Sequence, residues 1–220
     1  MDEPEVDVVL PCLNEAAALP GVLDGVRAIG ARAVVVDNGS TDGSAEVAAA
    51  HGAVVVTESR PGYGAAVHAG LVRADAALVC VLDADGSVDP AELPALLELV
   101  RTGAADLAAG RRVPVERGVL PWHARAGNAL LAGLLRRHGV AVRDLAPVRA
   151  ARRADLLALG VQDRAFGYPL ELLLRAGRAG WRVRELPVAY RPRAAGTTSK
   201  VSGSIRGTAR AARDMIGVLR

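Results

Sequence analysis

Two aspartates that directly follow a short apolar run are the residues best suited to chemistry in this sequence. The run is Leu78–Leu82, and Asp83 and Asp85 come after it, with Gly86 next. An unbroken apolar run of this length predicts a strand buried on both faces, as in a parallel sheet. Open α/β sheets bind their ligands beyond the carboxyl ends of the strands, where both carboxylates fall. Two hard oxygen donors there suit Mg²⁺ or Mn²⁺ carrying a substrate phosphate, and a polar turn that merely ends the strand is the competing interpretation.

The totals favour one well-buried α/β domain over two. The chain has 220 residues, of which 51% are hydrophobic and only 3% aromatic, so an aliphatic core is expected. The net charge is +3, but the first fifty residues hold only two arginines, Arg27 and Arg32, and most of the others lie after residue 100. An acidic front and an arginine-rich back suggest that the back half binds an anionic ligand; a solvated basic surface is the alternative.

The cysteines and the hydropathy bear on where the protein works. Cys12 and Cys80 lie in apolar runs without the spacing of a zinc site, so they are expected to be buried thiols in a reducing compartment. The acidic first residues differ from a signal peptide, and no run reaches the roughly 18 apolar residues that span a bilayer. We therefore expect a cytoplasmic protein. The four histidines have no ligand spacing, and no nucleic-acid partner is predicted.

The front half of the chain is typical of strands that alternate with helices. The expected strands are short and apolar and cover Asp7–Pro11, Ala33–Val36, Val54–Val56 and Leu78–Leu82. Helices are expected over residues 19–29, 45–50, 64–73 and 90–100. Ser40 or Thr41 would cap the second helix, and Asp89 would cap the fourth. The alternation predicts an α/β fold with a doubly wound, mostly parallel sheet flanked by helices.

The pattern loosens after Ala109. Gly110–Arg112 precedes an expected loop, and helices are expected over residues 122–137, 154–159 and 168–179, with strands over residues 140–144 and 181–187. In residues 201–220, apolar side chains share one helical face and arginines flank them. Such a basic amphipathic helix either lies on an anionic membrane or packs on its own domain.

Seven short motifs occur in order along the chain. They are Pro11–Glu15 (PCLNE), Val36–Gly43 (VDNGSTDG), Asp83–Asp85 (DAD), Gly110–Arg112 (GRR), Arg125–Asn128 (RAGN), Gly167–Glu171 (GYPLE) and Gly196–Lys200 (GTTSK). Each is weak alone, but together they resemble the family 2 inverting glycosyltransferases of the GT-A fold. The similarity is greatest to the branch that transfers mannose or glucose to a polyprenyl (dolichyl) phosphate, and it covers residues 6–205.

The resemblance implies a single domain over residues 1–220. Residues 1–110 would bind a nucleotide sugar, residues 111–200 would bind the acceptor, and residues 201–220 would form the basic tail. The implied reaction is metal-dependent and moves a hexose from a UDP- or GDP-sugar to a polyprenyl phosphate. Transfer to a soluble hydroxyl acceptor, such as a saccharide or natural product, stays open, as does a non-catalytic nucleotide-sugar-binding protein.

For the donor, the resemblance implies that the first two strand ends hold the nucleoside. The residues concerned are Pro11, Asn14, Glu15 and Asp37. Asp37 would accept a hydrogen bond from a base N–H, whereas the competing interpretation is turn chemistry, since Asn and Asp commonly begin turns. Gly62 and Gly64 would let the backbone approach the diphosphate closely, and Ala84 would join the donor site.

The resemblance gives the two aspartates a catalytic role. Asp83 and Asp85 would hold Mg²⁺ or Mn²⁺ on the diphosphate of the donor. Breaking the sugar–diphosphate bond leaves negative charge on the departing phosphate, which a bound cation stabilises by several kcal/mol. The polyprenyl-phosphate branch often has glutamine two residues after the second aspartate, but this chain has Ser87, a weaker ligand or one that acts through water.

For the acceptor, the resemblance points to basic residues of the back half. These are Arg112, with a catalytic role, and Arg125, Arg149, Arg193 and Lys200. A polyprenyl phosphate is already an anion, so it needs basic residues and no general base, whereas a hydroxyl acceptor needs a group that takes its proton. Candidates for that group are Asp144, Asp163 and Glu171. Peripheral contact with the inner face of the plasma membrane, or a separate membrane partner, would bring the enzyme to a lipid acceptor.

Overall fold

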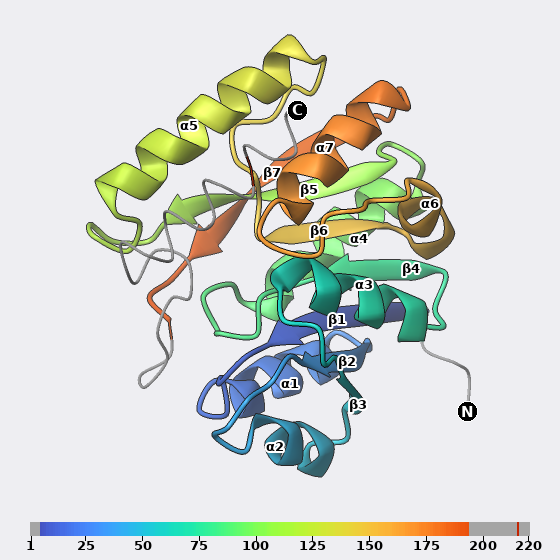
Figure 1. Cartoon of the computed structure of the whole chain (residues 1–220), viewed down its shortest axis with the longest axis vertical. Coiled ribbons are helices and arrows are strands. Elements are labelled where there is room, and N and C mark those ends of the chain that lie inside the picture. Colours follow the sequence, from blue (N-terminus) through green and yellow to red (C-terminus); the bar gives the residue numbers. More distant parts are fainter. Residues whose placement is uncertain (1–4, 194–214, 216–220) are drawn as a thin grey trace.

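A seven-stranded sheet forms the centre of the computed structural model, which describes residues 5–193 and Met215 (Figure 1). The strand order across the sheet is β3-β2-β1-β4-β6-β5-β7. The strands are β1 (Val6–Cys12), β2 (Arg32–Asp37), β3 (Val54–Thr57), β4 (Leu78–Val81), β5 (Leu107–Pro114), β6 (Val148–Arg152) and β7 (Val183–Tyr190). Only β6 runs against its neighbours β4 and β5. The predicted α/β fold with a mostly parallel sheet is therefore confirmed.

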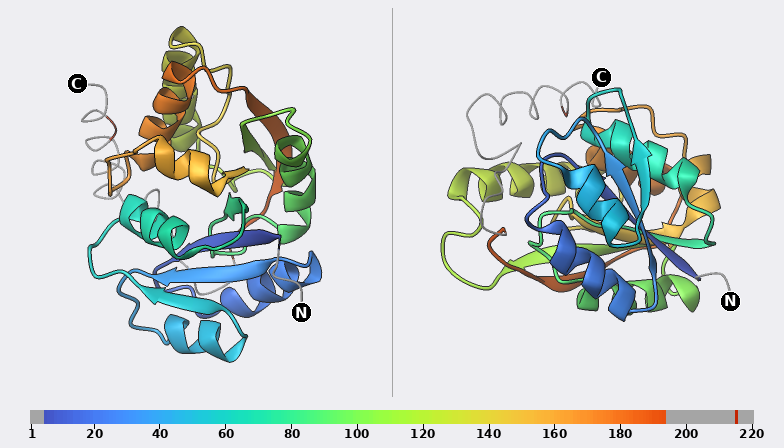
Figure 2. Two further views of the ribbon diagram at one scale, coloured as in Figure 1. Left: turned by 90° about the vertical axis from the view of Figure 1, so that its right-hand side faces the viewer. Right: turned by 90° about the horizontal axis from the view of Figure 1, so that it is seen from below.

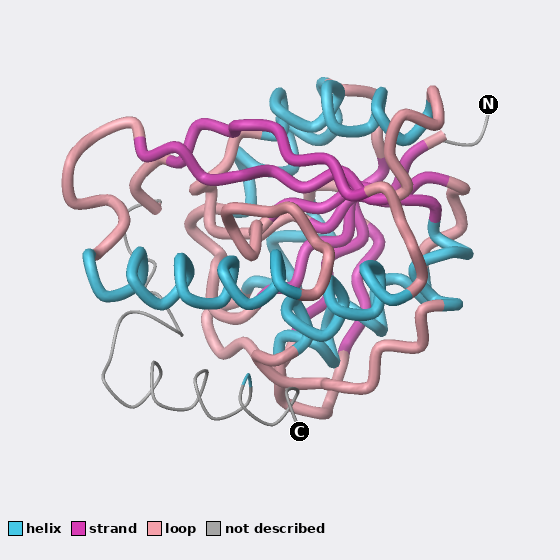
Figure 3. The backbone as a smooth tube through the Cα atoms, turned by 90° about the horizontal axis from the view of Figure 1, so that it is seen from above, coloured by secondary structure: helices cyan, strands magenta, loops and turns pink. Residues whose placement is uncertain are grey.

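Helices cover both faces of this sheet (Figure 2). One face carries α1 (Leu19–Ala28), α2 (Ser44–Ala50) and α4 (Leu93–Arg101), the last preceded by a 3₁₀ turn, η1 (Pro90–Glu92). The other face carries α3 (Tyr63–Arg73), α5 (Trp122–Arg137), α6 (Arg153–Ala158) and α7 (Tyr168–Arg178). Figure 3 shows the strands as a layer between these two sets of helices.

β1 is buried on both faces of the sheet, because its successive side chains point to opposite faces and helices cover both. In β1, Val8 and Leu10 belong to the core under α1 and α4, whereas Val9 belongs to the core under α3 and α7. All three are fully buried. β1 thus contributes to the cores on both faces of the sheet, which is why its residues from Val8 to Leu10 are all apolar instead of alternating with polar ones.

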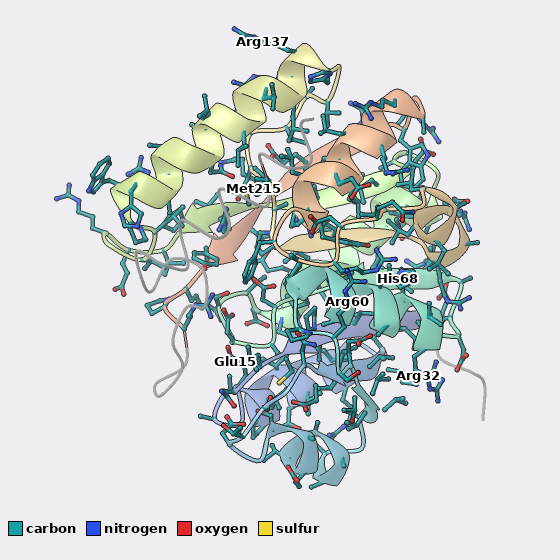
Figure 4. The ribbon with its side chains drawn as sticks, viewed as in Figure 1. Glu15, Arg32, Arg60, His68, Arg137 and Met215 are labelled. Atoms are coloured by element: carbon teal, nitrogen blue, oxygen red, sulfur yellow. The ribbon has the colours of Figure 1, made fainter. Side chains whose placement is uncertain are left out.

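Strand register brings the polar turns of the front half to one edge. β1 pairs in parallel with β2, so that Cys12 lies opposite Asp37. It also pairs in parallel with β4, so that Val9 lies opposite Val81. The segments that follow β1, β2 and β4 therefore leave the sheet side by side. Figure 4 shows Glu15 at this edge and Arg32 at the opposite one.

Two expectations about helix starts have different outcomes. Asp89 is confirmed as a cap, since its Oδ1 accepts a hydrogen bond from Ala91 N at 3.0 Å. The expected cap of α2 by Ser40 or Thr41 is wrong. The side chain of Asp42 instead accepts a hydrogen bond from the first turn of α2, because its Oδ1 lies 3.0 Å from Ser44 N. The two hydroxyl residues lie too early in the turn because Gly43, at φ 83°, is the residue before the helix.

The back half corrects two further expectations. No strand forms over residues 140–144; Arg143 N and Asp144 N instead donate to the Glu185 carboxylate at 2.9 and 3.0 Å. The sequence pattern also misses two strands, β5 and β6, and the sequence of β6, VRAAR, has two arginines and no long apolar run. The strand conformation of β6 depends on its pairing with β4 and β5, which no local sequence pattern predicts. The expected helices over residues 154–159 and 168–179 are found at α6 and α7.

Candidate active site

The loops after β1 and β2 form one hydrogen-bonded unit at the polar edge. Asn14 N donates to Ser40 Oγ at 2.9 Å, and Asn14 Oδ1 accepts from Thr41 N at 2.7 Å. Glu15 N donates to Ser44 Oγ at 2.9 Å. Asn14 adopts the left-handed conformation, at φ 56°, which asparagine tolerates better than most residues. The first two motifs therefore fold against each other, and the Asn14 side chain serves the neighbouring loop.

Asp37 and Asn38 end β2 at the same edge. Asp37 is buried, and its Oδ1 accepts from Ser40 N at 3.2 Å. Asn38 Nδ2 donates to the carbonyls of Glu58 and Arg60, both at 2.8 Å, and its Oδ1 accepts from Gly62 N at 2.8 Å. This role of Asn38 was not predicted from the sequence, although its place next to Asp37 in the second motif was a usable signal. Asn38 ties the end of β2 to the start of α3.

Asp83 and Asp85 follow β4 and share a charged environment. Asp85 Oδ1 accepts from Ser87 N at 2.9 Å, and Asp85 Oδ2 lies 2.7 Å from Arg193 Nη1. The same Arg193 nitrogen is 3.8 Å from Glu15 Oε1. Burial and the negative charge of Asp85 raise the pKa of Asp83 above its usual range, while Arg193, Arg149 and Arg112 oppose that rise. Asp83 and Asp85 therefore repel each other at this edge of the sheet, and the nearby arginines offset that repulsion only in part.

The donor set at these aspartates fits a divalent cation that is shared with a substrate. Among the described residues, no group of three or more His, Cys, Asp or Glu side chains could hold a metal. Mg²⁺ commonly binds through one or two carboxylates and completes its shell with substrate phosphates and water. Asp85 Oδ2 is buried and has no hydrogen-bond partner in the described part of the chain, and the same holds for the Ser87 hydroxyl. Apart from the ion pair between Asp85 Oδ2 and Arg193, these two oxygen atoms have no polar partner among the described residues.

Arg112 is committed to Asp144. Its Nε and Nη2 contact Asp144 Oδ2 and Oδ1 at 2.8 and 2.6 Å, and its backbone N donates to Oδ2 at 2.9 Å. The guanidinium carbon lies 5.6 Å from the centre of the Tyr190 ring. The two guanidinium nitrogens of Arg112 that could bind an acceptor phosphate are therefore already bound to the Asp144 carboxylate.

The other predicted basic residues are dispersed. Arg149, on β6, is fully buried; its Nη2 donates to Leu145 O at 2.6 Å, and its Nε and Nη1 have no hydrogen-bond partner among residues 5–193. Arg125 is exposed on α5. Arg193 contacts Asp85, and Lys200 lies outside the described residues. Arg193, Arg149 and Arg112 all act electrostatically on Asp83, so these three belong to its surroundings.

Two of the three candidate bases are engaged in ion pairs. Burial opposes ionisation of Asp144, but Arg112 outweighs it and holds the Asp144 pKa below its usual range. Burial likewise opposes ionisation of Glu171, whose pKa is nevertheless lowered by backbone N–H groups at Gln162 and Asp163 and by Arg175 at 2.6 Å. A carboxylate held in this way is a poor proton acceptor at neutral pH. Asp144 and Glu171 are therefore poor candidates for a general base, and their ion pairs indicate a structural role.

The two glycines before α3 pack against the protein's own backbone. A Cβ at Gly62 would lie 2.1 Å from Arg164 O, and one at Gly64 would lie 2.6 Å from Asp163 O. The N–H of Gly62 donates to Asn38 Oδ1, and that of Gly64 donates to Ala165 O. The close backbone approach is therefore present, but it is made to residues 163–165. The approach of these two glycines to a diphosphate stays a prediction, and the N–H groups of both already have partners within the protein.

We expect Gly64→Ala to lower the free energy of unfolding by about 2 kcal/mol, because the added methyl overlaps Asp163 O and the Tyr168 side chain. Gly21→Ala is the matched control, since Gly21 lies in α1 with no atom within 4 Å of its added Cβ. That control should match or exceed the wild type, as alanine favours helices. Urea denaturation of both variants measures the difference. Equal unfolding free energies for Gly64→Ala and the wild type would contradict the packing role.

Apolar side chains are exposed along one part of the back half. Trp122 and Leu130 on α5 are 79% and 76% exposed, and Val113 and Val115 near the end of β5 are also exposed. Arg125 lies on the same helix. In the described parts of the chain, no helix combines the length and apolar character needed to cross a membrane.

Comparisons with known proteins place the chain in a family. The family model described as glycosyl transferase family 2 matches residues 7–157. A glycosyltransferase of Mycobacterium tuberculosis is 58% identical over 204 residues, which cover 92% of this chain and 92% of its own. An undecaprenyl-phosphate mannosyltransferase of Micrococcus luteus is 34% identical and is matched over 91% of this chain and 89% of its own.

A solved structure gives the same result. The glucosyl-3-phosphoglycerate synthase of Mycobacterium tuberculosis, in complex with Mn²⁺, UDP and glucosyl-3-phosphoglycerate, superposes with a TM-score of 0.76 at 26% identity. The match covers 97% of this chain and 78% of that one. The GT-A-like fold and the family that the seven motifs predicted are both confirmed. This chain is a glycosyltransferase and belongs to glycosyl transferase family 2.

Proposed function

We propose that this protein is a metal-dependent, inverting glycosyltransferase that moves a hexose from a nucleoside-diphosphate sugar to a polyprenyl phosphate. The observation that carries the proposal is the pair Asp83 and Asp85 after β4, beside the linked loops that end β1 and β2. Residues 1–110 supply this donor side. A relative that is named an undecaprenyl-phosphate mannosyltransferase supports the lipid acceptor, and neighbours solved with UDP and Mn²⁺ or Mg²⁺ support the donor and the cation.

In the proposed reaction, a phosphate oxygen of the acceptor attacks the anomeric carbon of the sugar. A new C–O bond forms as the bond from that carbon to the diphosphate breaks, and its electron pair stays on the departing phosphate. A cation bound by Asp83 and Asp85 would stabilise that charge. Because the attacking oxygen belongs to an anion, the protein need not remove a proton, which agrees with the ion-paired state of Asp144 and Glu171.

A soluble acceptor is the second candidate. It is favoured by the likeness to glucosyl-3-phosphoglycerate synthase, whose complex holds a small phosphorylated product. An arginine-rich back half suits either acceptor, because both carry a phosphate. The lipid is preferred here because the sequence relative and the exposed apolar side chains on α5 point the same way.

The test separates donor from acceptor. A thermal-shift screen of UDP-, GDP- and dTDP-sugars, with and without Mn²⁺, ranks donors because a ligand of the native state raises its melting temperature. The best donor, carrying a labelled sugar, is then offered to washed membranes, to purified undecaprenyl phosphate, and to 3-phosphoglycerate. Label in the lipid alone supports the proposal, and label in the soluble acceptor alone supports the second candidate. Calorimetric binding of nucleotide without transfer to any acceptor would favour a binding protein instead.

Peripheral membrane contact through α5 follows from the lipid acceptor. We expect Trp122→Ser to weaken binding to vesicles that contain anionic phospholipid by roughly five-fold, because tryptophan favours the boundary between lipid and water. Val72→Ser, which removes an apolar side chain that is 56% exposed on α3, is the control and should bind as the wild type does. Co-sedimentation with vesicles measures both. Equal binding of the wild type and both variants would show that Trp122 on α5 does not contact the membrane.

A further inference from the structure

The segment that follows β7 lies against the loop that carries the paired aspartates. Arg191 N donates to Ser87 O at 2.8 Å, and Arg191 Nη1 contacts Asp89 Oδ2 at 2.9 Å. Arg193 Nη1 then reaches Asp85 Oδ2 at 2.7 Å. Residues 191–193 thus cross residues 85–89 in a fixed register. The backbone N–H of Arg191 anchors this crossing at one end, and Arg193 places its guanidinium at the other.

Asp85 Oδ2 is the oxygen that a cation would need. Asp85 Oδ1 already accepts from Ser87 N, so its other oxygen is the remaining donor on that residue. The Asp85 side chain is only 3% exposed, and the group facing its Oδ2 is the Arg193 guanidinium. A guanidinium and a divalent cation at the same carboxylate oxygen repel each other strongly. The pair in this structure and the metal-bound state are therefore mutually exclusive.

The contact between Arg193 and Asp85 has the features of an exchangeable pair. It is close, but Asp85 Oδ2 has no hydrogen-bond partner among the described residues, so the approach lacks hydrogen-bond geometry. By contrast, Arg112 makes three hydrogen bonds to Asp144. The Arg193 side chain is 28% exposed and can move without disturbing the core. It also lies between Asp85 and Glu15, and hence between the loops after β4 and β1.

We propose that Arg193 is a displaceable counter-ion of Asp85, which pairs with it before the donor binds and moves to the donor's diphosphate when the divalent cation takes its place. The inference rests on the proposed function and adds a positioning residue to it. The exchange keeps charge balanced, because a cation replaces the guanidinium at Asp85 while the anionic diphosphate receives it. Arginine suits both partners, since its planar fork binds carboxylate and phosphate oxygens alike.

The proposal predicts opposite effects of one substitution on two affinities. In Arg193→Gln, Mn²⁺ alone should bind roughly three- to ten-fold more tightly, because its competitor at Asp85 is gone. At saturating Mn²⁺, UDP and GDP should both bind several-fold more weakly, because the diphosphate loses a partner. Electron paramagnetic resonance of free Mn²⁺ measures the first affinity, and titration calorimetry measures the second. Arg193→Lys, which keeps the charge, should lie between the wild type and Arg193→Gln in both.

Arg191→Gln is the matched control. It removes the same charge two residues away, from an ion pair with Asp89 that is not at the proposed metal position. Both affinities should stay at the wild-type level.

Other outcomes overturn the inference in distinct ways. Arg193→Gln with both affinities lowered would show that Arg193 merely supports the loop, and no change in either would place its role elsewhere, such as at the acceptor. If Asp85→Asn binds Mn²⁺ as tightly as the wild type, the proposed metal site itself fails, whatever Arg193→Gln does. Near-ultraviolet circular dichroism confirms that each variant is folded before it is compared.

Discussion

Replacing Asp85 with asparagine is expected to lower glycosyl transfer by at least about a thousand-fold. The cation that Asp85 would hold stabilises the leaving diphosphate by several kcal/mol in the proposed reaction. Each loss of about 1.4 kcal/mol of that stabilisation lowers the rate about ten-fold. Asparagine keeps the shape and can still accept the hydrogen bond that Ser87 N gives to Asp85 Oδ1. The fold should therefore survive while the metal affinity is lost. Initial rates with the labelled donor, at several Mn²⁺ concentrations, measure the effect.

Asp89→Asn provides the control for this loss. Asp89 lies four residues further along the same loop, caps η1 through Ala91 N, and pairs with Arg191. Asparagine is an equally good cap, and the lost ion pair is half-exposed, so turnover should stay within about two-fold of the wild type. If Asp85→Asn turns over within about ten-fold of the wild type, or if EDTA leaves the wild-type rate unchanged, the cation has no such role.

The second large effect is on stability. Asp144→Asn is expected to lower the free energy of unfolding by about 3 kcal/mol, because it removes the charge that compensates the partly buried Arg112 guanidinium. The pair has 4% and 21% of its side-chain surfaces exposed, and it joins β5 to the segment before β6. Chemical denaturation at pH 7 measures the change.

Asp106→Asn tests whether burial is the reason. Asp106 and Arg182 form a similar forked pair, with contacts at 2.7 and 3.0 Å and a backbone N–H from Arg182 at 2.7 Å. Its side chains are 33% and 57% exposed, so its loss should cost less than about 1 kcal/mol. Equal losses for the two variants would show that burial does not set the strength of these pairs.

The Asp144 effect should also depend on pH. Since the folded-state pKa of Asp144 is lowered, its ionised form stabilises the protein above the unfolded value of about 3.9. That contribution is lost as the pH falls through the folded pKa. The difference in unfolding free energy between the wild type and Asp144→Asn should therefore be full at pH 6 to 7 and shrink below about pH 4. A difference that persists unchanged at lower pH would mean that packing, not charge, is responsible.

The donor edge was open to prediction because local pattern decides it. Short apolar runs that alternate with helical segments predict parallel strands, and parallel strands end at one edge of the sheet. Asp37, Asp83 and Asp85 therefore had to lie near each other once the strands were recognised. Their roles toward the nucleoside and the metal remain predictions.

The back half resisted the same reasoning because its structure depends on distant pairing. β6 contains Arg149, and a charged residue is not typical of an interior strand. β6 nevertheless lies between β4 and β5, and the Arg149 side chain is buried there. Likewise, the sequence shows that the back half holds many arginines, but not which carboxylate each one meets.

The amino-acid sequence by itself determined the α/β alternation, the family and the acidic strand end, since each of these depends on residues that are close together in the chain. Only the tertiary structure decided that Arg112 pairs with Asp144, that Arg193 faces Asp85, and that Gly62 and Gly64 pack on residues 163–165. Those contacts join segments from about 30 to more than 100 residues apart, and the chain's packing, not its local preferences, selects among the possible partners.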